Sequence, residues 1–163
     1  MSKHDKSYKK LFSHPKMVED LLRGFVHEDW IEELEFSTLE TVKDSFVSDN
    51  LKERHDDIIW RARWGSDWLY IYILLEFQST IDQFMAVRLM VYIGLLYQYL
   101  IKIEKLKKDD RLPPVLPIVI YNGTERWDAA KELNKLIADG PKALSKYRPR
   151  LRYLLIDEGS FGE

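Results

Sequence analysis

The segment that most constrains the fold of this chain is a pair of aromatic and β-branched runs joined by a tight turn. Residues 54–64 and 68–78 are separated by Gly65-Ser66-Asp67, and turn residues between two such runs are typical of a β-hairpin. The second run carries no charge before Glu76. A strand that is apolar on both sides is buried on both sides, so we expect a central strand in a sheet that helices cover on both faces.

The rest of the hydrophobic pattern predicts one α/β domain with a mixed central sheet flanked by helices. The length of 163 residues sets the domain count near one. In chain order we expect a short helix before Ser13, a helix over 15–24, a strand over 34–46, the hairpin, a long helix over 81–106, a strand over 115–121, a helix over 127–139 and a strand over 151–156.

Composition excludes several classes of chemistry. The chain has no cysteine, which excludes disulfides, cysteine nucleophiles and thiolate metal sites. The absence of a glycine-rich phosphate loop and of a serine nucleophile elbow excludes nucleotide-driven motors and serine hydrolases, so no nucleotide cofactor is expected. The amino-terminal stretch is polar, and the longest apolar run is about eight residues against the roughly 20 of a membrane helix. We therefore expect a cytoplasmic protein without a membrane partner.

A group of acidic and polar residues falls at the far end of the predicted hairpin. The period of two along a strand places Glu76 and Gln78 on one face. A two-residue loop at Ser66-Asp67 would place Asp57 directly across from Glu76, on that same face. A three-residue loop would pair Asp57 with Leu75 instead, and a bulge would then be needed to bring the carboxylates together.

Two carboxylates at this spacing favour metal-assisted chemistry. Like charges so close repel, and a divalent cation with oxygen ligands removes the repulsion. The pattern therefore suggests Mg²⁺ held by Asp57 and Glu76, attack of water on a phosphodiester, and Gln78 orienting the water or the phosphate. In the alternative interpretation Glu76 is a strand-end carboxylate paired with an arginine such as Arg54 or Arg88, and spacing alone does not choose between the two.

The formal charge of −2, from 25 basic and 27 acidic residues, means that any nucleic acid must be met by a local patch. Basic residues that could line a groove beside the carboxylates and contact phosphates without reading sequence are Lys6, Lys9, Lys10, Arg54, Arg61, Arg63 and Arg88. The alternative is an ordinary solvated face.

Four stretches, in order along the chain, resemble the Rpn family of recombination-promoting nucleases, which are also labelled transposases of the YhgA-like type. They read HDKSYKKLF over 4–12, RHDDIIW over 54–60, LLEFQS over 74–79 and LPIVIYNG over 116–123. In addition, Asp57 followed about 20 residues later by Glu76-Phe77-Gln78 is similar to the PD-(D/E)XK nuclease signature.

The resemblance implies an αβββαβ restriction-endonuclease-like core and Mg²⁺-dependent endonuclease cleavage of double-stranded DNA. Mn²⁺ or Ca²⁺ are other candidate ions. The resemblance also implies a role in bacterial recombination or mobile elements. By position, Asp57 and Glu76 become metal ligands, and Gln78 stands where the motif has lysine. Because glutamine carries no charge, the alternative function is a catalytically degenerate module that binds DNA or assembles, for instance as a homodimer through the tyrosine-bearing long helix. Family members tend to be longer, so we expect residues 1–163 to be a single nuclease-like domain in the N-terminal part of a longer chain.

Overall fold

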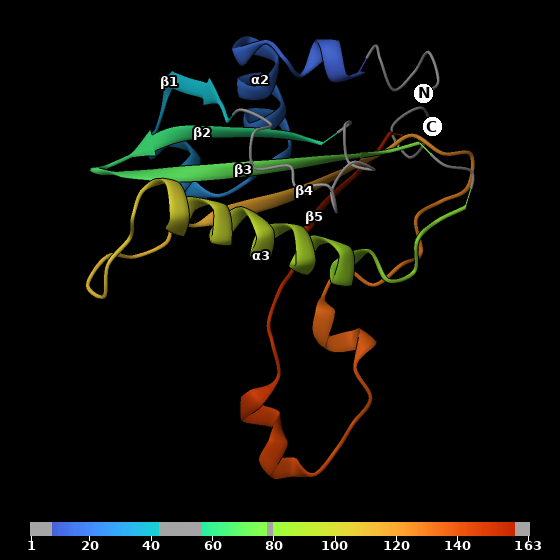
Figure 1. The fold of residues 1–163 in the computed structure, drawn as a ribbon. Helices are drawn as coiled ribbons and strands as arrows, with labels where there is room; N and C mark the ends of the chain where they lie inside the picture. The colour runs from blue at the N-terminus through green and yellow to red at the C-terminus, as the bar shows by residue number, and fades with distance from the viewer. Residues whose placement is uncertain (1–7, 43–56, 78–79, 159–163) are drawn as a thin grey trace.

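A five-stranded mixed sheet lies between two helices in the computed structural model, which describes residues 8–42, 57–77 and 80–158 (Figure 1). The strands are β1 (Leu34–Thr41), β2 (Ile58–Trp64), β3 (Asp67–Glu76), β4 (Val115–Tyr121) and β5 (Leu154–Asp157), in that spatial order. The first three strands pair antiparallel, and β3, β4 and β5 run parallel. The central position predicted for the apolar strand is therefore confirmed.

The predicted hairpin forms, but its turn lies one residue earlier than the register argument assumed. Trp64 pairs with Asp67, and Gly65 adopts a φ of 63°, in the left-handed region that favours glycine. Each β2 residue consequently pairs two positions earlier on β3 than predicted, as Ile58 does with Ile73. A shift of two residues changes the partners and keeps every side chain on its predicted face.

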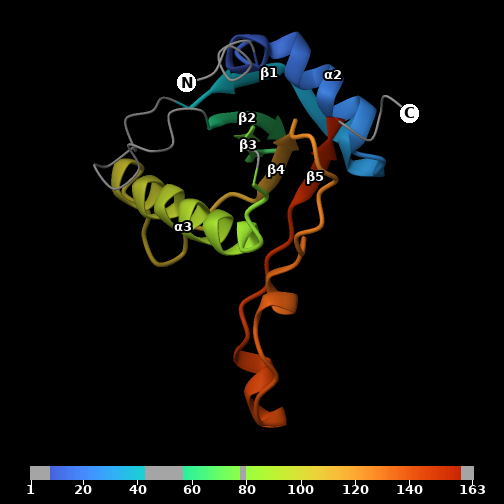
Figure 2. The ribbon, with the colours of Figure 1, turned by 90° about the vertical axis from the view of Figure 1, so that its right-hand side faces the viewer.

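Helices cover both faces of the sheet, as the burial of β3 requires. After a helical turn over 8–11, α2 (Pro15–Phe25) packs on one face through Val18, Leu21 and Leu22, and the 3₁₀ turn η1 (Asp29–Glu33) leads into β1. The opposite face is covered by α3 (Met85–Ile103), whose Leu89 and Leu96 are fully buried. Figure 2 shows α2 and α3 on opposite sides of the strands.

Helix α3 is shorter than the predicted helix over 81–106. It is also apolar along most of its length, which the longest uninterrupted apolar run of about eight residues did not indicate. In the described part of the chain it is the one helix that length and composition would allow to cross a membrane. Its buried residues lie against the sheet, while Val91 and Ile101 on its outer side are about half exposed.

The α-helix predicted over 127–139 is wrong. The chain between β4 and β5 instead contains the 3₁₀ turns η4 (Leu133–Leu136) and η5 (Lys142–Tyr147) within a projecting segment. Glu132 pairs with Arg152 as an isolated antiparallel bridge, and Leu133 donates its N–H to the Leu151 carbonyl at 2.9 Å. These bonds to distant residues hold the backbone extended and override its local helical preference. The predicted strand over 34–46 ends at Thr41, and residues 43–46 lie outside the described ranges.

Two neighbouring positions on α3 test how the helix packs. A Cβ added at Gly94 would meet no atom within 4 Å, so Gly94→Ala should raise the free energy of unfolding by about 0.5–1 kcal/mol through helix propensity alone. Leu96 is fully buried, so Leu96→Ala should lower that free energy by about 2–5 kcal/mol. Urea denaturation measures both, and a stabilising Leu96→Ala would contradict the packing of α3 on the sheet.

Candidate active site at the carboxyl end of β3

Glu76 ends β3 and is the one buried charged residue within the described ranges, with 3% of its surface exposed. Arg88 of α3 donates from Nη1 to its Oε2 at 2.9 Å, and the same nitrogen lies 3.2 Å from Asp82 Oδ2. A buried carboxylate must be neutralised by a partner, and α3 supplies one. The pairing of Glu76 with Arg88, which the sequence left open, is therefore present, whereas Arg54 lies outside the described residues.

The environment of Arg88 keeps this residue positively charged. Burial by itself acts to lower the pKa of the guanidinium, but the hydrogen bond and charge of Glu76, followed by those of Asp82, raise the pKa above its ordinary value. Arg88 Nε is buried and has no hydrogen-bond partner among the described residues. This N–H is therefore a buried donor that the described residues leave unsatisfied.

Asp57 precedes β2 and is held by the hydroxyl of Tyr72, which donates to its Oδ2 at 2.6 Å. The Tyr72 ring stacks with Tyr92 of α3 at a centroid distance of 6.3 Å. The observed register, continued by one residue, places Asp57 across from Leu74, so the predicted direct pairing with Glu76 is wrong. Asp57 and Glu76 still lie on the face of the sheet that α3 covers, as diagonal neighbours on adjacent strands. The Cα atoms of such neighbours are about 7–8 Å apart.

Two residues that sequence reasoning missed lie in the same row of the sheet as Glu76. The parallel register aligns Glu76 with Tyr121 at the end of β4, and Tyr121 with Asp157 at the end of β5. The Tyr121 ring is fully buried. Burial, followed by the charge of Asp157, raises the pKa of this phenol. The missed signal was that the carboxyl ends of neighbouring parallel strands meet at one edge.

A close backbone approach fixes the Tyr121 ring. A Cβ on Gly123 would overlap the Tyr121 ring and hydroxyl, so glycine is required at this point of the Asn122-Gly123 turn. Asp157 is held in turn by the Trp127 N–H, which donates to its Oδ2 at 3.1 Å. The row therefore consists of one acid paired with arginine, one buried phenol and one acid bonded to backbone.

The carboxylates suit a hard cation, although the described donors are few. Mg²⁺ in proteins takes one or two carboxylates and completes its shell with water and phosphate oxygens, and Asp57 and Glu76 provide two such groups on one face. Within residues 8–42, 57–77 and 80–158, no three His, Asp or Glu side chains converge as a metal-holding group. Arg88 already neutralises Glu76, and Gln78 lies outside the described residues.

The structure places the described basic residues of the predicted groove at different ends of the sheet. Arg88 contacts Glu76. Arg61 and Arg63 lie toward the hairpin turn, where both stack on Trp68 at 4.2 and 3.9 Å from its ring centre. Arg63 lies six positions after Asp57 along the chain, which corresponds to roughly 20 Å of extended backbone.

The other basic candidates do not lie on the α3 face either, as far as they are described. Lys9 and Lys10 belong to the helical turn whose Tyr8 and Phe12 pack into the core on the α2 side of the sheet. Lys6 and Arg54 lie outside the described residues. The described candidates other than Arg88 therefore do not meet beside Glu76, and the groove stays a prediction.

The fold is that of a mixed α/β domain with an acidic pair at the end of its central strand. The chain belongs to the family described as "Putative transposase, YhgA-like", which matches residues 2–161. The resemblance predicted from the four sequence stretches is thereby confirmed.

Three relatives from Escherichia coli show how far the similarity extends. The chain is 32% identical over 121 residues to recombination-promoting nuclease RpnD of strain O157:H7, covering 74% of this chain and 45% of the relative. It is 30% identical over 123 residues to recombination-promoting nuclease RpnA of strain K12, covering 75% and 40%. It is also 34% identical over 89 residues to the K12 "Putative inactive recombination-promoting nuclease-like protein YjiP", covering 55% and 86%.

The chain therefore spans less than half the length of RpnD and of RpnA. No solved structure matches it.

The buried ion pair gives a stability prediction. Arg88→Met removes the cation 2.9 Å from the buried Glu76 carboxylate and should lower the free energy of unfolding by about 3–5 kcal/mol. The double variant Arg88→Met/Glu76→Leu removes both charges and should recover most of that loss. Chemical denaturation at neutral pH measures both variants, and a cost below about 1 kcal/mol for Arg88→Met would show that Glu76 does not depend on Arg88 in solution.

Proposed function

We propose that this chain is a nuclease domain that hydrolyses phosphodiester bonds of double-stranded DNA, with Mg²⁺ bound by Asp57 and Glu76. The observation that carries the proposal is the position of these carboxylates on one face at the end of the central strand of an Rpn-related chain. The element order of helix, three antiparallel strands, helix and strand agrees with a PD-(D/E)XK core. The names of RpnD and RpnA support a role in recombination.

The roles proposed for the side chains follow from their contacts. A bound Mg²⁺ would polarise a phosphoryl oxygen and acidify a water molecule. Tyr72 orients Asp57 through its 2.6 Å hydrogen bond, and the stacking of Tyr72 on Tyr92 fixes that donor. Arg88 limits the repulsion between the carboxylates through its ion pair with Glu76. Gln78 is proposed to orient the attacking water or the phosphate.

A second candidate function is a DNA-binding or assembly module without catalysis. The specific observation that favours it is the ion pair between Arg88 and Glu76, because a guanidinium 2.9 Å from the carboxylate competes with any metal ion for that oxygen. Glutamine in place of the motif's lysine at position 78 points the same way. The relative YjiP also carries "inactive" in its name.

Cleavage of supercoiled plasmid in the presence of Mg²⁺ or Mn²⁺ tests the first function. Asp57→Ala and Glu76→Ala should each lower the cleavage rate by about 10–100-fold or more, since each removes a proposed metal ligand. The matched control is Asp67→Ala, an exposed carboxylate at the other end of β3, which should cleave like the parent. Undiminished cleavage by both site variants would reject the site, and absence of cleavage by the parent with DNA binding intact would favour the second function.

Metal binding can be tested without activity by thermal unfolding. A ligand that binds the folded state alone stabilises it, by about 2.7 kcal/mol at 100 times its Kd, so Mg²⁺ should raise the Tm of the parent and of Asp67→Ala. The increase should disappear in Asp57→Ala. In Arg88→Met the metal-dependent increase should exceed that of the parent, because the competing guanidinium is gone. Equal increases in the parent and in Asp57→Ala would place the ion elsewhere.

A further inference from the structure

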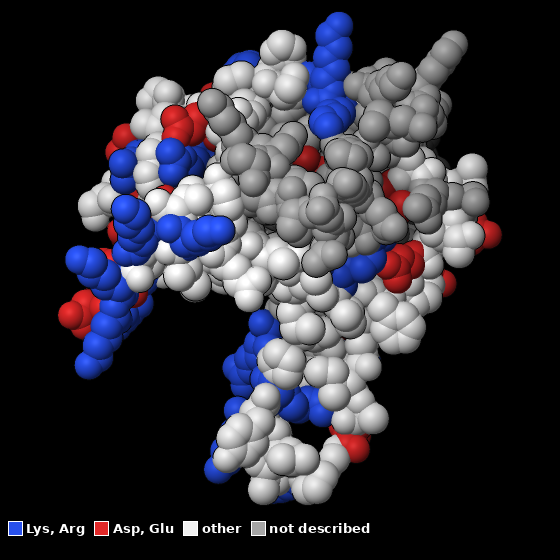
Figure 3. Space-filling model, in the orientation of Figure 1, with Lys and Arg blue, Asp and Glu red and all other residues white. Residues whose placement is uncertain are grey.

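The segment between β4 and β5 carries a charge opposite to that of the rest of the chain. Residues 131–152, called the arm below, project from the α3 side of the sheet (Figures 1 and 2). The arm has seven basic and two acidic residues, a formal charge of +5, whereas the other residues number 18 basic and 25 acidic, a charge of −7. The net charge of the whole chain is therefore near zero although the arm is strongly basic. Figure 3 shows basic side chains of the arm in blue below the body of the molecule.

Most of the positive charge on the arm is not neutralised. One ion pair lies within it, between Arg152 and Glu132 at 3.0 Å. Five further cations are without an ion-pair partner among the described residues: Lys131, Lys135, Lys142, Lys146 and Arg150. All five are exposed to solvent. By contrast, Arg61 and Arg88 on the body each contact carboxylates. Exposed lysines also lie at and beyond the end of α3, and the arm differs from that stretch in gathering five such cations on one projection.

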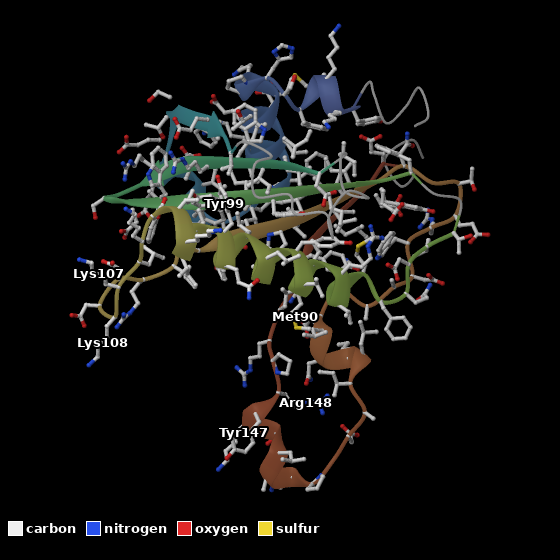
Figure 4. All side chains as sticks on the ribbon, viewed as in Figure 1. Met90, Tyr99, Lys107, Lys108, Tyr147 and Arg148 are labelled. Atoms are coloured by element: carbon white, nitrogen blue, oxygen red, sulfur yellow. The ribbon has the colours of Figure 1, made fainter. Side chains whose placement is uncertain are left out.

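The arm is held in shape by its own hydrogen bonds. Arg148 donates from Nε to Asn134 Oδ1 at 2.6 Å and from Nη2 to the backbone carbonyls of Asn134 and Ile137 at 2.9 and 2.7 Å. Its Nη1 reaches the Ala138 carbonyl at 2.9 Å, and Figure 4 shows Arg148 between the descending and returning backbone segments of the arm. Because these bonds order the arm in advance, its cations are presented at a low entropic cost of binding.

The base of the arm is anchored beside the candidate active site. Tyr153 donates its hydroxyl to the Ala130 carbonyl at 2.9 Å and accepts from Trp127 Nε1 at 3.0 Å. The Trp127 backbone N–H holds Asp157, in the same row as Glu76. Arm and carboxylates therefore lie on the same side of the sheet and are joined by short, bonded segments.

We propose that the arm binds the sugar-phosphate backbone of duplex DNA, through its five unpaired cations and without reading sequence. The proposal rests on the proposed function in that the bound duplex would be the substrate. A protein partner fits less well, since lysine is depleted in protein interfaces whereas DNA interfaces are strongly positive. The large apolar side chains exposed on the arm are Leu144 and Tyr147, too few for the apolar core of a protein interface.

The test measures DNA binding separately from cleavage. A fluorescein-labelled duplex of random sequence is titrated with the chain in EDTA, and anisotropy is followed between about 50 and 200 mM salt. Five phosphate contacts predict a log–log salt slope of about −4.5, a loss of roughly 500-fold in affinity over that range. The arm variant Lys135→Gln/Lys142→Gln/Lys146→Gln/Arg150→Gln should have a slope near −1 and bind at least about tenfold more weakly at 100 mM salt.

The matched control removes the same number of exposed cations elsewhere. Lys102, Lys105, Lys107 and Lys108 lie at the end of α3 and beyond it, and Figure 4 shows Lys107 and Lys108 well away from Tyr147 on the arm. Replacing all four of these lysines by glutamine gives the same net charge as the arm variant. This control should keep most of the DNA affinity and of the salt slope of the parent. Equal losses in both variants, with unchanged circular dichroism, would mean a bulk charge effect and overturn the proposal.

The remaining outcomes separate this inference from the proposed function. Arm-dependent binding by a chain that never cleaves plasmid would support the arm and reject the nuclease. Metal-dependent cleavage with affinity unchanged in the arm variant would reject the arm and keep the nuclease. Concentration-dependent dimerisation of the parent, lost in the arm variant while DNA affinity is unchanged, would assign the arm to a second copy of the chain and overturn the proposal.

Discussion

The burial of β3 on both faces is the constraint on which the rest of this structure depends. Its residues from Leu69 to Glu76 are all buried, so each face must be covered and each flanking strand must align with it. Helix α2 covers one face and α3 the other. An acidic residue at the end of such a strand loses its hydration, and Arg88 of α3 neutralises it through an ion pair.

The ion pair between Glu76 and Arg88 links stability to the candidate chemistry. The same carboxylate that the family resemblance assigns to a metal ion is held by a guanidinium within hydrogen-bond distance. Tyr72 holds Asp57 in a comparable way, so both acids have partners that orient them from the protein side. In this interpretation, whether a metal ion or the guanidinium holds that oxygen decides between the nuclease and the module without catalysis.

The charge distribution shows how a chain with a net charge near zero can engage a polyanion. The arm carries a formal charge of +5 and the other residues −7, and the arm projects from one side of the sheet. If the arm binds DNA as proposed, it would also orient the duplex, because its field acts within about a Debye length, roughly 8–10 Å in physiological salt. DNA held by the arm would approach the face that carries Asp57 and Glu76, and the opposite face would stay clear.

The sequence by itself determined the hairpin, the central strand, the covering helices and the face shared by Asp57 and Glu76. These follow from local turn chemistry and from periods of two and 3.6 residues, which need no knowledge of distant contacts. It also indicated the family, through short motifs in a fixed order. Tertiary structure alone decided the register, because moving the turn by one residue changes every pair, and it selected Arg88 as the partner of Glu76. It also turned the expected helix over 127–139 into the arm, since pairing of residues 131–133 with 151–153 outweighs local helix propensity.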